Sequence, residues 1–182
     1  MRLFVALGLP DPIRRIFEGL HLGLSGARRI PSHQLHLTLA FLGDVGPDRQ
    51  GDVHAALSGV TGPPVTLRLA RGGTFGSRAA PTVLWSAVER DPPLIALQAR
   101  VEDALATIGF ERPRRAFVPH VTLARLKKPH RSQLAQAVDA ISAAQAPPQR
   151  VDTFALYSSA LSSKGATYHV EHVYPLKGLG AH

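Results

Sequence analysis

The sequence predicts an α+β fold: a bilobal unit duplicated about a pseudo-twofold axis, with two antiparallel sheets facing a central cleft and helices on their outer faces. Segments 35–43 and 119–125 each have the alternation of a strand, and each carries His-x-Thr, 84 positions apart. Strands and helices follow in the same order around both copies, and internal duplication is the economical explanation. Each half alone has too few strands to cover both faces of a sheet, so the two halves are expected to pack together.

The first half is expected to run strand, helix, His-x-Thr strand, helix and strand. Alternation marks its strands, apolar residues at helical spacing mark its helices, and proline and glycine mark their ends. The predicted elements are a strand at 2–8, a helix with apolar positions from 13 to 24, the strand at 35–43, a helix at roughly 47–59 and a strand at 65–70. The segment 71–78, rich in glycine and arginine, is either a ligand-lining loop or an ordinary hairpin loop.

The second half repeats this order and adds one strand at its end. Its predicted elements are a strand at 82–88, a helix from 92 to 108, a basic connector at 112–115, the strand at 119–125, a helix through 134–141, and strands at 151–157 and 166–173 joined by 158–165. No segment has the composition of an interdomain linker. The chain is therefore predicted to be one domain, 1–182, of two intertwined lobes, approximately 1–80 and 81–182.

The two His-x-Thr motifs are the candidate chemical groups. Because side chains on a strand alternate faces, His36 shares a face with Thr38, and His120 shares one with Thr122. A single such motif is common by chance and is usually structural. The chain has two copies, each followed by Leu-Ala, and a shared functional role explains this repetition better than chance does. Together they would place two imidazoles and two hydroxyls in one cleft, an arrangement that suits the binding of a phosphate.

These residue types suit attack on a cyclic phosphodiester without a metal. One group must take a proton from water and another must give one to the leaving oxygen, and imidazole does either near neutral pH. Hydroxyls add neutral donors for the charge that grows on the non-bridging oxygens. Neither motif contains a carboxylate and the chain has no cysteine, so a metal hydrolase is a poor fit and no cofactor is expected.

Composition narrows the class of protein and its partners. With 182 residues, 45% of them hydrophobic and 19% charged, the chain is globular. A net charge of +8 favours anionic partners, nucleic acid first, although high arginine content can also reflect the source genome. The absence of cysteine excludes disulfides and a cysteine nucleophile. No apolar run reaches the length of a membrane span, so we expect a soluble, cytoplasmic protein. We further expect it to be a monomer.

At the level of motifs the chain resembles a known family. The matching segments are His36-Leu37-Thr38-Leu39, His120-Val121-Thr122-Leu123, Arg2-Leu3-Phe4-Val5-Ala6, Phe41-Leu42-Gly43 and Phe117-Val118-Pro119-His120. They resemble the two-histidine phosphoesterase superfamily, and within it the bacterial and archaeal RNA 2',3'-cyclic phosphodiesterases, also called 2'-5' RNA ligases. The resemblance covers essentially the whole chain.

The resemblance implies hydrolysis of a terminal 2',3'-cyclic phosphate to a 2'-phosphate, on RNA ends or small cyclic nucleotides, and in some members 2'-5' joining. By analogy His36 is the proton donor to the 3' oxygen, and His120 is the base that activates water. Thr38 and Thr122 would bind phosphate oxygens. Arg125 matches a phosphate-binding arginine of relatives, although strict alternation from His120 turns it away unless a bulge intervenes.

Other residues are weaker candidates for contact with the substrate. Phe41 matches a base-stacking position of relatives, but alternation groups it with buried Leu39 and favours a core role. Five arginines are candidates for a diffuse rim that holds the RNA backbone, or are ordinary surface charges: Arg28, Arg29, Arg78, Arg114 and Arg115. The histidines without a partner threonine are expected to be structural or exposed: His21, His33, His54, His130, His169, His172 and His182.

The chain departs from the family where relatives carry an aromatic and acidic sequence before the first motif and a Glu-Ser in the late strand. It has Arg29-Ile30-Pro31 and Tyr157-Ser158-Ser159 there, so substrate length and base preference do not follow from the resemblance. A non-catalytic RNA or nucleotide binding module is the alternative function, and the intact histidine pair argues against it. No Gly-x-Ser-x-Gly or phosphate-loop motif supports another hydrolase or a transferase.

Overall fold

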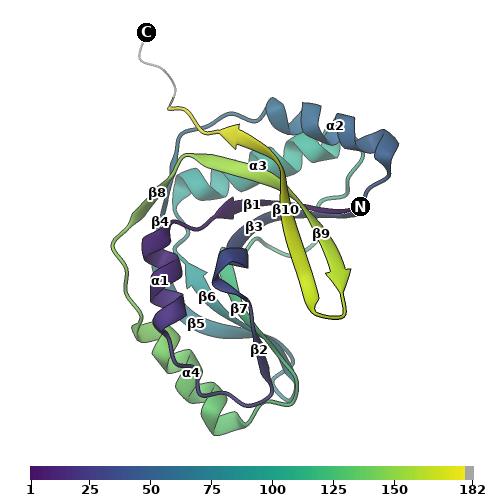
Figure 1. Ribbon diagram of the computed structural model, residues 1–182. Helices are drawn as coiled ribbons and strands as arrows, with labels where there is room; N and C mark the ends of the chain where they lie inside the picture. Colours follow the sequence, from purple (N-terminus) through teal and green to yellow (C-terminus); the bar gives the residue numbers. More distant parts are fainter. Residues whose placement is uncertain (179–182) are drawn as a thin grey trace.

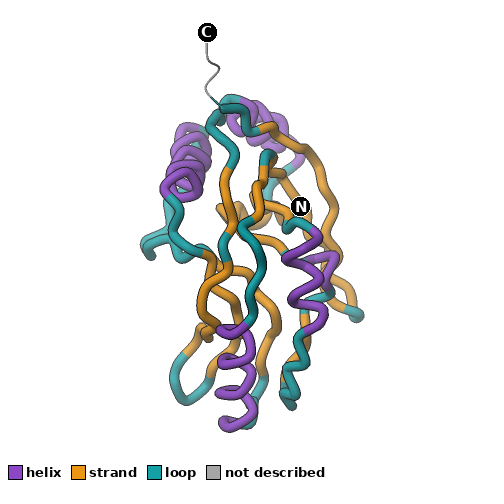
Figure 2. Tube along the Cα trace, turned by 90° about the vertical axis from the view of Figure 1, so that its left-hand side faces the viewer, coloured by secondary structure: helices purple, strands orange, loops and turns teal. Residues whose placement is uncertain are grey.

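Antiparallel strands run through the middle of the molecule, and helices lie outside them (Figures 1 and 2). The computed structural model describes residues 1–178. The strands are β1 (Arg2–Gly8), β2 (Ala27–Arg29), β3 (His36–Asp44), β4 (Val65–Leu67), β5 (Leu69–Gly76), β6 (Pro81–Val88), β7 (His120–Leu126), β8 (Gln149–Val151), β9 (Thr153–Ser162) and β10 (Gly165–Pro175). The helices are α1 (Asp11–Gly19), the 3₁₀ turn η1 (Ser32–Gln34), α2 (Pro47–Ser58), α3 (Pro92–Thr107) and α4 (Arg131–Ala143).

Most strands belong to one sheet. Its order is β10-β9-β1-β3-β7-β6-β5, with β2 paired to β7, while β4 and β8 form a separate pair. The α+β class and the antiparallel pairing are confirmed, but the expected division into two sheets that face each other is wrong. The strands β3 and β7 pair directly through Leu37 and Val121, so the two halves join in one sheet. Alternation within a strand does not show which strand lies beside it.

The core lies between the sheet and the helices. Leu37 and Val121, at the junction of the halves, belong to the same buried cluster as Phe17 of α1 and Val101 of α3. Helix α3 packs on β3, α4 packs on β5, and α2 lies against α3 (Figure 1). Because side chains alternate, the histidine and threonine of each motif strand point to the face opposite this core.

Several boundaries differ from the expected ones. The segment 71–78 is mainly strand, because β5 runs to Gly76 and pairs with β6. The loop expected at 158–165 is also mainly strand, since β9 continues to Ser162 and β10 begins at Gly165. Helix α1 ends at Gly19, before the apolar positions 20 and 24. Long-range strand pairing decides the boundaries of β5, β9 and β10, and a local sequence pattern does not contain it.

Candidate active site

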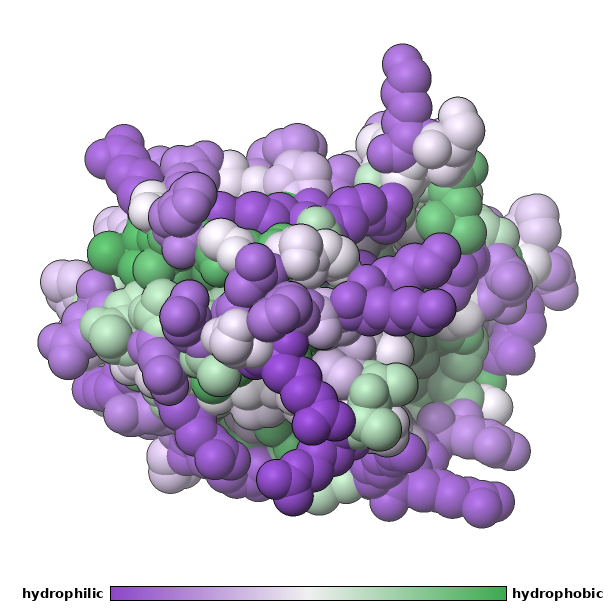
Figure 3. All heavy atoms as spheres, turned by 90° about the horizontal axis from the view of Figure 1, so that it is seen from below, coloured by the Kyte–Doolittle hydropathy of each residue, from purple (hydrophilic) through white to green (hydrophobic). Residues whose placement is uncertain are grey.

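Both His-x-Thr motifs line one pocket of about 720 Å³. Its walls come from strands β1, β2, β3 and β7 and from the hairpin β9–β10. The five residues predicted for the site all line it: His36, Thr38, His120, Thr122 and Arg125. Seen from below, the surface is largely hydrophilic and opens into a recess with hydrophobic side chains at its base (Figure 3). The structure therefore brings together residues 84 positions apart in the chain.

A bulge follows the threonine in each motif strand. In β7, Thr122 lies opposite Trp85 and Ala124 opposite Leu84, so Leu123 is an extra residue in the register. A bulge of this kind shifts the alternation by one position. It turns Arg125 back to the face of Thr122, where the guanidinium lines the pocket. Strict alternation placed it on the opposite face.

The same bulge in β3 corrects the interpretation of Phe41. Here Ala6 pairs with Thr38 and Val5 with Ala40, which leaves Leu39 as the extra residue. Phe41 consequently lies on the pocket face with 75% of its surface exposed. The expected core role for this residue is wrong, because the bulge separates it from the buried face of Leu39.

Aromatic side chains surround the His36 imidazole. The ring of Phe4 lies 4.9 Å from it, and the ring of Tyr168 meets it edge-on at 5.4 Å. Its Nδ1 lies 2.7 Å from the carbonyl oxygen of Gln34. Burial lowers the pKa of His36, and the positive charges of His120 and Arg125 lower it further, against the hydrogen bond to Gln34, which raises it.

His120 has a matching but more open environment. Its Nδ1 lies 2.7 Å from the carbonyl oxygen of Val118, and the ring of Phe75 meets the imidazole edge-on at 4.8 Å. Burial lowers the pKa of His120, and the charge of Arg125 adds to this, whereas the hydrogen bond to Val118 raises it. Both imidazoles are therefore biased towards the neutral form.

The two backbone contacts fix how the rings can act. A carbonyl oxygen only accepts, so Nδ1 of His36 and of His120 must carry the proton in each contact. The basic nitrogen of each neutral ring is then Nε2. Each histidine can take or give one proton at that atom while its ring orientation stays fixed.

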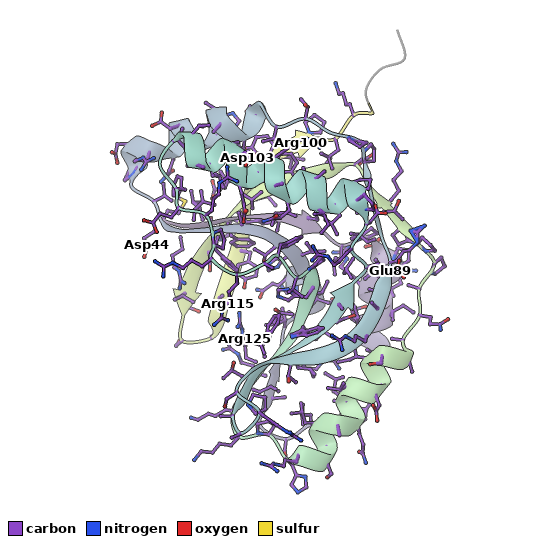
Figure 4. The ribbon with its side chains drawn as sticks, turned by 180° about the vertical axis from the view of Figure 1, so that it is seen from behind. Asp44, Glu89, Arg100, Asp103, Arg115 and Arg125 are labelled. Carbon is purple, nitrogen blue, oxygen red and sulfur yellow. The ribbon has the colours of Figure 1, made fainter. Side chains whose placement is uncertain are left out.

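The pocket carries several cations without a carboxylate partner. Among the described residues, Arg2, Arg28, Arg125 and Lys164 line it and none takes part in an ion pair. Arg28 lies directly opposite Arg125 across β2 and β7. Arg125 lies between helix α3 and helix α4 in the view from behind (Figure 4). This charge pattern suits a polyanionic ligand.

The expected arginine rim is only partly at the pocket. Arg28 and Arg29 line it, whereas Arg78, Arg114 and Arg115 do not. Arg29 also has a structural role, because its guanidinium donates to the carbonyl oxygens of Phe17 and Leu20 at 2.6 Å each and satisfies the end of α1.

Several pocket residues were absent from the sequence prediction. Gln34 of η1 and Tyr168 of β10 line the pocket and contact His36, while Tyr157 of β9 lies beside His36 without lining that pocket. Only the pairing of distant strands brings the two tyrosines there, so no local pattern marks them, whereas Gln34 lies two residues before His36 in the sequence. Of the other histidines, the rings of His54 and His172 stack on each other at 3.7 Å, and His182 lies outside the described residues.

Within residues 1–178, no group of three or more His, Cys, Asp or Glu side chains is placed to hold a metal ion. In that same range, no helix is both long and apolar enough to cross a membrane.

Comparison with known proteins identifies the family. The model of the 2'-5' RNA ligase superfamily matches residues 9–162. The chain belongs to this superfamily. The resemblance carried by the two His-x-Thr motifs is therefore confirmed.

Curated relatives and solved structures agree with the match. An RNA 2',3'-cyclic phosphodiesterase of Archaeoglobus fulgidus is 33% identical over 92% of this chain and 96% of its own length. A crystal structure of a Thermus thermophilus protein aligns with a TM-score of 0.80 at 29% identity, covering 99% of this chain and 100% of that one. The Escherichia coli protein LigT, crystallised with 3'-AMP, aligns with a TM-score of 0.72 at 28% identity, over 96% of this chain and 97% of LigT.

Proposed function

We propose that the chain is a metal-independent RNA 2',3'-cyclic phosphodiesterase, which opens a terminal 2',3'-cyclic phosphate to a 2'-phosphate. One observation carries the proposal: two His-x-Thr pairs face a single basic pocket, and a backbone carbonyl holds Nδ1 of each histidine. Membership of the superfamily and relatives named for this activity support the same reaction.

The reaction needs two proton transfers, and the residues can supply both. Nε2 of His120 takes a proton from water as its oxygen attacks phosphorus, and Nε2 of His36 gives a proton to the departing 3' oxygen. The products are a 2'-phosphate and a free 3'-hydroxyl. Each such transfer typically contributes about 10²–10⁴-fold. A ribose 5'-hydroxyl in place of water would give a 2',5'-phosphodiester by the same two steps.

The remaining site residues would hold the phosphate. The hydroxyls of Thr38 and Thr122 donate to its non-bridging oxygens, and the guanidinium of Arg125 offsets the charge that develops on them. Phe41 presents an exposed aromatic face in the wall, on which a base could stack. The unpaired cations Arg28 and Lys164 would contact the RNA backbone.

We also propose that the molecule is a duplicated, bilobal unit with the pocket as the cleft between its lobes. In support, β9-β1-β3 and β5-β6-β7 have the same order and the same bulge after the threonine. The pair Leu37–Val121 lies at the centre, one residue after each histidine. One chain supplies both motifs, which is in keeping with the expected monomer.

The test is cleavage of a short RNA ending in a 2',3'-cyclic phosphate, in EDTA, with assignment of the product phosphate. We expect the wild-type protein to form a 2'-phosphate, and His36→Ala and His120→Ala to lose activity by about a hundredfold or more, as loss of a general acid or base predicts. His21→Ala is the matched control, because this histidine is exposed and outside the pocket.

Two results would contradict the proposal. Binding of the RNA without cleavage by the wild-type protein would favour the alternative function, a non-catalytic RNA or nucleotide binding module in the same basic pocket. Cleavage that requires a metal and survives both histidine substitutions would assign the chemistry to other residues.

A further inference from the structure

A second, smaller pocket of about 250 Å³ lies on the other side of His36. It is enclosed by the end of β1, helix α1, the turn η1 and the hairpin β9–β10. Four residues line both pockets: Gln34, His36, Thr167 and Tyr168. A ligand in the small pocket would therefore adjoin a ligand at the two histidines, because the same four residues would contact both.

The lining of the small pocket suits a phosphate-bearing unit. It presents the guanidinium of Arg14, the imidazole of His33 and the hydroxyls of Tyr157 and Thr167, and no carboxylate lines it among residues 1–178. Arg14 pairs with Asp11 one turn away on α1. The side chain of Asp11 is 62% exposed and that of Arg14 is 37% exposed. Ion pairs in contact with solvent contribute little, so the guanidinium can exchange this partner for a phosphate.

Resting on the proposed function, we infer that the small pocket binds the nucleotide preceding the cyclic phosphate terminus and that Arg14 contacts the phosphodiester joining the last two nucleotides. The pocket is somewhat smaller than the usual range for drug-sized ligands, about 300–1,000 Å³, so it suits a single nucleotide unit. An RNA strand that leaves the main pocket past Tyr168 enters it directly. The preferred substrate is then an oligoribonucleotide end and not a mononucleotide.

The experiment compares kcat/KM for a dinucleotide ending in a 2',3'-cyclic phosphate with that for the corresponding cyclic mononucleotide. The wild-type protein should favour the dinucleotide, and Arg14→Ala should lower the ratio about tenfold, the usual effect of losing a hydrogen bond to a charged group. Arg15→Ala is the control, because Arg15 is the next residue on the helix but lines neither pocket.

A second variant blocks the pocket without removing a charge. Val170 lines only the small pocket and is 55% exposed, so Val170→Trp should fill it and also lower the ratio. Val173→Trp adds the same bulk on the same strand at a residue that is 58% exposed and lines neither pocket, and should leave the ratio unchanged.

The outcomes separate this inference from the proposed function. Turnover of the mononucleotide with no preference for the dinucleotide would overturn the inference and leave the phosphodiesterase intact. A preference that survives both Arg14→Ala and Val170→Trp would also overturn it, because the main pocket would then supply the preference. Failure to cleave either compound would instead count against the proposed function.

Discussion

At the scale of single residues, Arg125 influences both histidines. Its positive charge lowers the pKa of His36 and of His120, in each case alongside the larger effect of burial. A nearby cation disfavours protonation, so its removal must raise both pKa values. The bulge at Leu123 that turns Arg125 into the pocket thus also shifts the pH range in which one ring is protonated and the other neutral.

Arg125→Gln should move the pH dependence of activity. The pH profile of kcat/KM reports the pKa values of the free enzyme, so both limbs of a bell-shaped curve should shift to higher pH in this variant, apart from any loss of rate. Arg28→Gln is the control, because Arg28 pairs opposite Arg125 but contributes to neither histidine pKa shift. If both limbs of the Arg125→Gln profile stay at the wild-type pH, the charge of Arg125 does not influence the pKa values of the two imidazoles.

At the scale of elements, one side chain links the hairpin β9–β10 to the turn η1. Gln34 accepts from Nδ1 of His36 through its backbone carbonyl, and its side-chain amide donates to the carbonyl oxygen of Ala166 at 2.8 Å. The hairpin carries Lys164, Thr167 and Tyr168 into the pocket wall. The turn η1 therefore connects the orientation of a histidine with the position of this hairpin.

Gln34→Met keeps the size of the side chain but removes its donor. The backbone contact to His36 remains, so we expect KM for RNA to rise several-fold with a smaller change in kcat, from loss of a bond worth about 0.5–1.5 kcal/mol. Amide hydrogen exchange at the start of β10 should become faster. Gln149→Met is the control, because Gln149 donates to the carbonyl oxygen of Pro147 at the start of β8 and lines neither pocket. Unchanged exchange in β10 would contradict this role of Gln34.

The elements also show what local sequence could and could not predict. Periodicity located β1, α2, β6 and α3 within about two residues, because each has an unbroken pattern with proline or glycine at its ends. The histidine and threonine positions followed from simple alternation. Phe41 did not, since the bulge at Leu39 depends on how β3 pairs with β1. Tyr168 enters the site only through pairing of β10 with β9, which no local pattern encodes.

At the scale of the whole molecule, both halves share one core across the junction of β3 and β7. Leu37 is fully buried there and pairs with Val121 of the other half. Both residues belong to one continuous buried cluster, so the two lobes should unfold as one cooperative unit. The single tryptophan, Trp85, lies buried in β6 and reports on the part of the sheet formed by β5, β6 and β7.

Leu37→Ala tests this coupling, because it changes the first half and is observed in the second. Truncation of a buried leucine should lower the free energy of unfolding by about 2–5 kcal/mol. In urea, the midpoints from Trp85 fluorescence and far-UV circular dichroism should fall together. Leu161→Ala, at an exposed leucine of β9, should change stability by less than about 0.5 kcal/mol. If the fluorescence midpoint stays in place while the circular dichroism midpoint falls, the two halves unfold separately. The pocket between them would then be lost when only one half unfolds.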